Sequence, residues 1–376
     1  MGVAWLLATG CPADGGTAAD ETTEGASSTG ASAADSEGVA PDPDASGDAD
    51  DGPGPGTSAS DAGSDDGTTD DATGDPPGTA DDPADAGPGT WQTAQAQVEI
   101  DGATIPLSLF IPDAAGPHPV VVLTHGFQLG PADYASYGAH LASYDYVVVM
   151  PQMPGSLFSP ETHVQLRAYL VGILDWIDAE GADPTGALLG RADPGQVALA
   201  GHSMGGKISL LTASADARPK AIFGIDPVDA AGGPGQGPSP DYPSVTPELM
   251  PLVVVPVALV GETTNATGGL GGACAPEADN FHQYFIHATA PALEVEFLGA
   301  NHMSFLDNPN CPVACLACPA GSDDTTVTRQ RTQGLMVAFL QTTLRGDTSY
   351  APWLTGDPMQ AFVDAGLVTF ATANGF

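Results

Sequence analysis

The sequence predicts an α/β fold in which a mostly parallel sheet is covered on both faces by helices. Short, continuously apolar segments, typical of buried parallel strands, alternate with longer segments whose apolar residues have helical spacing. Repeated strand–helix–strand units place successive strands in parallel and pack the connecting helices on the sheet. The 286 residues from 91 to 376 are enough for one sizeable core and are expected to form one domain.

The expected elements follow one another along this region. Residues 97–113 largely alternate apolar and polar side chains around Asp101-Gly102, which predicts two edge strands joined by a turn. The expected buried strands are residues 120–124, 146–150, 197–200, 221–225, 256–260 and 293–298. The expected helices are residues 161–180, 204–215, 276–288 and 327–344, the last preceded by Asp323 and Asp324 and ended by Gly346.

Residues 12–90 have a different composition. Their only large aliphatic residue is Val39, they contain no aromatic residue, and Asp, Gly, Ala, Ser, Thr and Pro dominate. Such a segment cannot bury enough apolar surface to offset the chain entropy lost on folding. We therefore expect a disordered, extended linker, with an acidic interaction tail as the alternative.

Residues 1–11 are a short apolar run that ends in small residues and Cys11. They resemble a bacterial lipoprotein signal, in which the cysteine becomes the lipidated first residue. No basic residue precedes the run, as expected if translation starts upstream of Met1. The resemblance implies export, with anchoring to an outer membrane or cell surface through Cys11 or else secretion. The alternative is an accidental apolar N-terminus.

The charge balance excludes several classes of partner. The chain has 47 acidic and 8 basic residues, a formal net charge of −39. Residues 11–90 hold 20 of the acids and no base, which leaves 27 acids against 8 bases, or −19, in the rest. Nucleic acid and anionic lipid need clustered basic residues, so neither is expected, and membrane contact is expected only through the lipid anchor. The acidity of the rest favours a salty habitat, where counterions screen self-repulsion.

Four cysteines accompany Cys11, namely Cys274, Cys311, Cys315 and Cys318. An even number outside the predicted lipid site favours two disulfides in an oxidising compartment, without selecting the pairs. The alternative is a zinc site, because the spacing of the last three is typical of metal ligands.

The segment Gly201-His-Ser203-Met-Gly205 follows an apolar strand and precedes a helix. In that context the chain turns sharply at the serine, whose neighbours must be small, and the hydroxyl is presented above the sheet. The following helix also directs the positive end of its dipole toward any anion formed there. These features predict that Ser203 is a nucleophile; the alternative is a glycine-rich turn around a buried serine.

A serine nucleophile needs a base, and three histidines follow Ser203. His282 and His287 belong to an expected amphipathic helix, which gives them a structural role. His302 lies in a loop directly after a buried strand, so we expect it to be the general base. A serine nucleophile and a histidine base can perform this chemistry by themselves, so no metal and no organic cofactor is implied.

The acid that orients the base is left open among three carboxylates. Pro227 fixes the backbone directly after Asp226, which would hold that carboxylate at a strand end. Glu262 follows the next strand, where such an acid usually lies, and Asp229 is the third candidate.

An oxyanion hole needs two backbone N–H groups. One is expected from Met204, after the nucleophile, and the other from Phe127 in the loop after residues 120–124. The alternative is that His125-Gly126 is only a turn. His125 and His202 are expected to shape their loops.

Several motifs resemble the chlorophyllase branch of the α/β-hydrolases over residues 119–346. They are Thr124-His-Gly-Phe127, Gly201-His-Ser-Met-Gly-Gly206 with Lys207, Gly224-Ile-Asp-Pro-Val228, Cys274-Ala-Pro276, Asn301-His-Met303 and Val337-Ala-Phe-Leu340. The resemblance implies the α/β-hydrolase fold and Asp226 as the triad acid. Plant chlorophyllases carry Arg after the nucleophile, whereas Met204 stands here; the motif around it is similar to bacterial cutinase-like and polyester-degrading hydrolases.

Together these features predict a serine-dependent hydrolase of carboxylic esters that carry an apolar group. Residues expected to line an apolar pocket are Phe127, Met153, Leu157, Phe158 and Met204. Candidate substrates are chlorophyll-type esters, acylglycerols and polyesters. The alternative class is a noncatalytic surface protein on a hydrolase scaffold.

Overall fold

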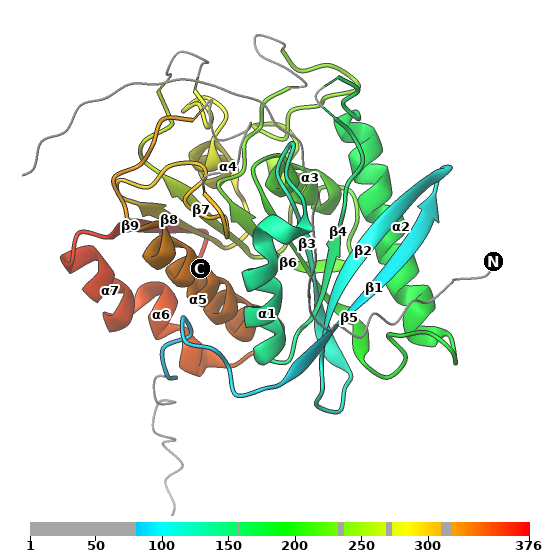
Figure 1. The fold of residues 1–376 in the computed structure, drawn as a ribbon. Coiled ribbons are helices and arrows are strands. Elements are labelled where there is room, and N and C mark those ends of the chain that lie inside the picture. The colour runs from blue at the N-terminus through cyan, green and yellow to red at the C-terminus, as the bar shows by residue number, and fades with distance from the viewer. Residues whose placement is uncertain (1–79, 157, 232–236, 268–272, 310–317) are drawn as a thin grey trace, which may run out of the picture. The chain divides into compact units, whose positions relative to one another are not determined.

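A computed structural model describes residues 80–376 except 157, 232–236, 268–272 and 310–317 (Figure 1). The predicted lipoprotein-type leader with Cys11, most of the predicted linker, and Leu157, Cys311 and Cys315 lie outside the described residues. Within the described part of the chain, no helix combines the length and apolar character needed to cross a membrane.

One sheet of nine strands forms the centre of the described structure, in the order β1-β2-β4-β3-β5-β6-β7-β8-β9. Strands β3 to β8 pair in parallel, whereas β1, β2 and β9 are antiparallel additions at the two edges. The strands are β1 Trp91–Ile100, β2 Ala103–Pro112, β3 His118–Thr124, β4 Val147–Pro151, β5 Ala192–His202, β6 Pro219–Ile225, β7 Val257–Glu262, β8 Ala292–Phe297 and β9 Val368–Ala373. The predicted mostly parallel α/β architecture is confirmed.

Helices cover both faces of this sheet (Figure 1). In β3, Val120 and Val122 point into one core and Val121 and Leu123 into the other, because successive side chains alternate. One face packs against α2, α3 and α4, and the other against α1 and α5 to α7. The helices are α1 Ala135–Ser143, α2 His163–Ala182, α3 Met204–Ala213, α4 Phe281–His287, α5 Thr325–Leu344, α6 Pro352–Thr355 and α7 Asp357–Asp364, with 3-10 turns at Pro131–Tyr134, Met250–Leu252 and Thr348–Tyr350.

Local signals placed several boundaries well. Asp101 and Gly102 have positive φ angles of 51° and 84° and join β1 to β2, as the turn prediction required. The Asp324 carboxylate accepts the backbone N–H groups of Thr326 and Val327 and so caps α5. Gly346, at φ 71°, follows the end of that helix.

Other elements differ from the prediction. The helix expected over residues 276–288 is shorter, because it begins after the Asn280 cap, whose side chain accepts the His282 N–H. Helices α1, α6 and α7 and strand β9 were not predicted. Strand β9 is a partly exposed edge strand that pairs only with β8, so its burial pattern is weaker than that of the central strands.

Residues 80–90, which the sequence assigned to the linker, pack on the domain instead. Asp82 forms an ion pair with Arg331 at 2.5 Å, and the carbonyl of Ala80 accepts the Trp353 indole N–H at 3.0 Å. The carbonyl of Pro83 is 2.8 Å from Nε2 of His140. Composition alone missed these contacts because backbone carbonyls and the Asp82 carboxylate make them, and neither has a hydrophobic pattern in the sequence.

Candidate active site

Ser203 lies in the sharp turn between β5 and α3. Its φ and ψ angles are 54° and −122°, a region that residues other than glycine rarely adopt. The neighbouring glycines are required by close approach: a Cβ on Gly205 would lie 2.2 Å from the Thr124 carbonyl oxygen. The turn therefore has the strand–turn–helix geometry that the sequence predicted, with the serine at its apex.

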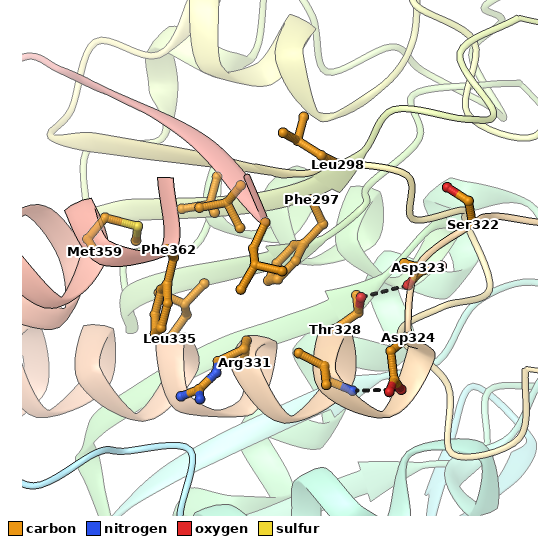
Figure 2. Close-up of a pocket in the computed structure, with 14 residues that line it drawn as sticks. Phe297, Leu298, Ser322, Asp323, Asp324, Thr328, Arg331, Leu335, Met359 and Phe362 are labelled. Atoms are coloured by element: carbon orange, nitrogen blue, oxygen red, sulfur yellow. Dashed lines mark hydrogen bonds between the residues drawn. The ribbon is translucent and has the colours of Figure 1, made fainter. Parts of the chain in front are cut away.

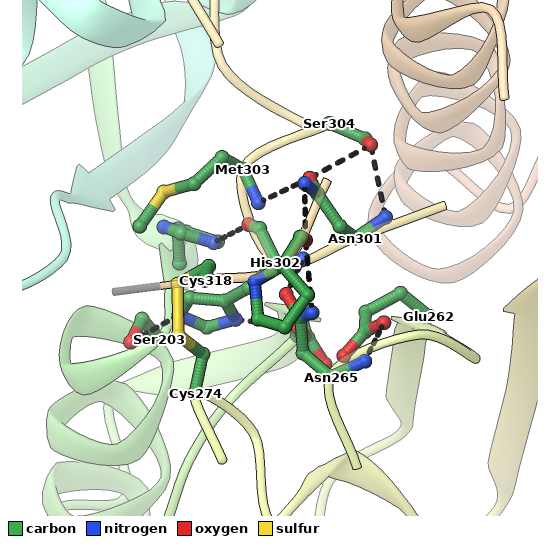
Figure 3. Close-up of a disulfide and its surroundings, with 12 residues drawn as sticks. Ser203, Glu262, Asn265, Cys274, Asn301, His302, Met303, Ser304 and Cys318 are labelled. Atoms are coloured by element: carbon green, nitrogen blue, oxygen red, sulfur yellow. Dashed lines mark hydrogen bonds and ion pairs between the residues drawn. A yellow bond between two sulfur atoms is a disulfide. The ribbon is translucent and has the colours of Figure 1, made fainter. Parts of the chain in front are cut away.

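The fold brings Ser203, His302 and Asp226 together from three separate segments. Ser203 Oγ lies 2.9 Å from His302 Nε2, and His302 Nδ1 lies 2.6 Å from Asp226 Oδ2. Figure 3 shows the Ser203 and His302 side chains pointing toward one another. The three residues form a hydrogen-bonded line of nucleophile, base and acid.

Burial determines the protonation state of the base. It lowers the pKa of the His302 imidazole to about 4, so the ring is neutral at neutral pH. In that state Nδ1–H donates to the Asp226 carboxylate, and Nε2 accepts the hydroxyl proton of Ser203. The tautomer is the one that lets His302 take a proton from the serine.

Asp226 follows β6 and is fully buried. Its φ angle of 41° is also unusual for a residue with a side chain, and its N–H donates to the Val260 carbonyl at 2.7 Å. Burial raises the pKa of the carboxyl, while the hydrogen bond from His302 favours the ionised form.

The other two candidate acids have different partners. Asp229 forms a buried ion pair with Lys207 at 3.0 Å and also accepts hydrogen bonds from Ser244, Val245 and Thr246. Glu262 Oε2 accepts the backbone N–H groups of two residues in the turn after β7, at 2.5 and 2.7 Å. Hydrogen bonding to His302 therefore distinguishes Asp226 from both.

Both residues expected to supply the oxyanion donors belong to segments next to Ser203. Met204 begins α3, where backbone N–H groups have no intrahelical acceptor. A Cβ on Gly126 would lie 3.3 Å from that of Ser203, so the loop carrying Phe127 borders the nucleophile. His125 shapes this loop, because Nδ1 donates to the Gly126 carbonyl at 2.8 Å and Nε2 accepts the Met153 N–H at 2.9 Å.

Three supporting residues hold the base in place. His202 Nε2 donates to the His302 carbonyl at 2.9 Å, and its Nδ1 accepts the hydroxyl of Tyr134 at 2.7 Å. Asn265 Oδ1 accepts the His302 N–H at 2.9 Å. Sequence reasoning assigned His202 only a loop-shaping role and missed Tyr134 and Asn265, since nothing local indicates contacts across such sequence separations.

A disulfide between Cys274 and Cys318 lies beside the triad (Figure 3). Pro319, next in the chain, accepts hydrogen bonds from the side chains of Asn265 and Asn301 at 3.1 and 2.9 Å. The disulfide therefore joins the loops that position His302. It also removes Cys318 from the alternative zinc-ligand set, and the described residues contain no cluster of three potential metal ligands.

The residues predicted to line an apolar pocket differ widely in their exposure. Met153 is buried, but 40% of Phe127 and 95% of Phe158 are exposed. A separate cavity of about 300 Å³ lies between the β8–β9 edge and helices α5 and α7 (Figure 2). Its lining includes Phe297, Leu335, Met359 and Phe362 and none of Ser203, Asp226 or His302, so it is not where an ester would meet the serine.

A mostly parallel sheet with helices on both faces and a serine at a strand–helix turn defines the α/β-hydrolase fold. The family model for chlorophyllase matches residues 85–370, so the chain belongs to the chlorophyllase family, whose namesake enzymes are carboxylic ester hydrolases.

Plant enzymes are among its relatives. Chlorophyllase-2 of Arabidopsis thaliana is 28% identical over 63% of this chain and 76% of its own length. Chloroplastic chlorophyllase-1 of Citrus sinensis is 27% identical over 72% of this chain and 82% of its own length. Chlorophyllase-1 of Arabidopsis thaliana is 28% identical over 67% of this chain and 80% of its own length.

Proposed function

We propose that this protein is a serine-dependent carboxylic ester hydrolase that acts through an acyl-enzyme on esters with an apolar acyl or alcohol group. The observation that carries the proposal is the hydrogen-bonded line from Ser203 through His302 to Asp226. Membership of the chlorophyllase family supports the ester as the bond that is cleaved.

In the acylation half, His302 Nε2 takes the proton of Ser203 as Oγ attacks the ester carbonyl carbon. The Asp226 carboxylate stabilises the imidazolium that forms. The negative carbonyl oxygen is held by the backbone N–H groups of Met204 and Phe127. Collapse of this intermediate breaks the carbon–oxygen bond, and the alcohol leaves with the proton from His302.

In the deacylation half, a water molecule replaces the alcohol. His302 takes a proton from the water as its oxygen attacks the acyl carbon. The same two N–H groups hold the oxyanion, and Ser203 leaves with the proton returned by His302. The carboxylic acid is released and the enzyme regains its starting state.

The side chain after the nucleophile bears on the choice of ester. Met204 is partly buried at the start of α3 and packs against the core of that face. A thioether beside the oxyanion hole favours apolar groups, and Phe127, whose loop borders Ser203, exposes a further apolar side chain. Chlorophyll-type phytyl esters, acylglycerols and polyesters all have such groups. Measuring hydrolysis rates on a panel of esters that includes chlorophyll and a polyester film ranks these substrates.

The direct test is Ser203→Ala assayed on a short p-nitrophenyl ester. Loss of the nucleophile is expected to lower kcat by roughly 10⁶-fold, by analogy with other serine hydrolases. A folded variant with undiminished turnover would sink the proposal. Labelling of the wild-type protein by a fluorophosphonate, absent in the variant, separates an enzyme from a noncatalytic protein on a hydrolase scaffold.

A further inference from the structure

Two buried carboxylate oxygens, one within the triad and one on the neighbouring strand, have no hydrogen-bond partner among the described residues. They are Oδ1 of Asp226 and Oε1 of Glu262, and both belong to side chains that are at most 1% exposed. Buried polar atoms are almost always hydrogen-bonded, because an unpaired one costs free energy. Two unpaired acceptors at the ends of neighbouring strands would both gain a partner if one carried a proton and donated it to the other.

The two side chains lie at the ends of neighbouring parallel strands. Asp226 directly follows β6, and Glu262 is the last residue of β7. Ile225 pairs with Val260, and the Asp226 N–H donates to the carbonyl of that residue at 2.7 Å. The register therefore brings both carboxyl groups to the same edge of the sheet.

The charges around Glu262 oppose its ionisation. Burial, the negative charge of Asp226 and, to a smaller extent, that of Glu296 on β8 together raise the pKa of this carboxyl to about 8. The backbone N–H groups of Asn265 and Thr264 lower the pKa, each by less than burial or Asp226 raises it. His302, the one nearby group that becomes cationic in the reaction, hydrogen-bonds to Asp226 rather than to Glu262.

We propose that Glu262 is a positioning residue that keeps a proton on Oε1 and donates it in a hydrogen bond to Oδ1 of Asp226. A neutral carboxyl group has one accepting and one donating oxygen. Oε2 already accepts the two backbone N–H groups, which leaves Oε1 to carry the proton. Asp226 then has a donor on each oxygen, His302 on Oδ2 and Glu262 on Oδ1.

This role rests on the proposed function and extends it. The second donor stabilises Asp226 as a buried carboxylate, the form that must balance the imidazolium of His302. Glu262 also acts on the base through its other oxygen, because Oε2 holds Asn265 and the Asn265 side chain accepts the His302 N–H. Figure 3 shows Glu262 directed at Asn265 beside the His302 loop.

The first test is infrared spectroscopy in the inactive Ser203→Ala background, which does not depend on turnover. At pH 7 we expect the C=O stretching band of a protonated carboxylic acid, lost as the pH rises through about 8. Adding Glu262→Gln must remove the band. A matched control is Glu294→Gln, which changes a largely buried carboxyl on β8 bonded to His282 and must leave the band intact. No band at pH 7, or a band that survives Glu262→Gln, would overturn the proposal.

The second test is activity in the Ser203-containing enzyme. Glu262→Gln keeps a donor and an acceptor and is expected to retain kcat within about threefold of wild type. Glu262→Met removes both and is expected to lower kcat by about ten- to a hundredfold at unchanged KM, the range for losing a hydrogen bond to a charged group. Equal losses in the two variants contradict the proposal. If Ser203→Ala hydrolyses esters, the proposed function fails, and the infrared result still decides the role of Glu262.

Discussion

Asp226 and Asp229 are three residues apart and both buried, yet they have opposite surroundings. Asp229 has a counterion and a full set of hydrogen-bond donors. Lys207 forms an ion pair with it at 3.0 Å, and Ser244, Val245 and Thr246 donate to its oxygens. Asp226 has no cationic partner in the resting state: among the described residues it accepts a hydrogen bond from neutral His302, besides the one that we propose from Glu262.

The difference distinguishes an acid that joins segments of the structure from the acid that we propose takes part in catalysis. A buried carboxylate that is already paired with a cation gains little further stabilisation when a neighbour becomes charged, so its role is to join segments of the chain. A buried carboxylate without a counterion still responds to a developing positive charge, because the attraction between the two charges is strong in a water-poor site. Burial raises the pKa of Asp226, and no cation in the resting site offsets this effect.

Exchanging Asp226 for Asn should give the largest effect. Asn cannot hold the His302 tautomer that accepts the serine proton, so kcat is expected to fall by about 10⁴-fold, as in other triads. Thermal unfolding of the purified variant should stay close to wild type, because the substitution removes no cation's partner. A loss confined to Glu262→Gln, with Asp226→Asn fully active, would reverse the assignment of the acid.

The same exchange at Asp229 should act on stability instead. Asp229→Asn leaves the buried Lys207 ammonium without its counterion, and breaking such a pair costs about 3–5 kcal/mol. Urea unfolding measures this loss, and the folded fraction should retain its kcat. The double variant Asp229→Asn/Lys207→Met should recover part of the stability; if it does not, the ion pair is not the source of the loss.

The fall of kcat/KM at acidic pH should also distinguish Asp226 from Asp229, by a smaller effect. Burial lowers the pKa of His302, so the base stays neutral well below its ordinary value of 6.5. As pH falls through the pKa of His302 in the folded enzyme, the imidazole is protonated and kcat/KM is expected to fall. The midpoint should lie near pH 4 and should not move in Asp229→Asn. A midpoint at 6.5 or above would show that the Asp226 carboxylate raises the pKa of His302 by more than burial lowers it.

Exposed acids should give the smallest effect. The chain outside residues 11–90 has a formal charge of −19, and most of these acids are not buried in pairs like Asp229. Lowering the salt concentration lengthens the range of their repulsion and should lower Tm by a few degrees, on the order of 1 kcal/mol. A flat response of Tm to salt removes screening as the reason for the acidity.

Much of the fold was predictable because its signals are local. Continuous apolar runs identified the central strands, Asp101-Gly102 identified a hairpin turn, and Asp324 identified the start of α5. Elements at the periphery were missed, since β9 and α7 expose much of their surface and carry only partial patterns. The attachment of residues 80–90 was missed because their backbone groups and Asp82 make the contacts.

The sequence by itself determined which residue types are available for chemistry and where each lies relative to a strand end. Ser203 lies at a strand–helix turn, His302 lies after a later strand, and the three candidate acids lie between them in the chain. It did so because turn geometry and strand burial are encoded in a few adjacent residues. Only the tertiary structure decided which acid meets the base, since that depends on the register of β6 against β7 and on which carboxylate Lys207 neutralises. Register and ion pairing are contacts between distant segments, and no local pattern carries them.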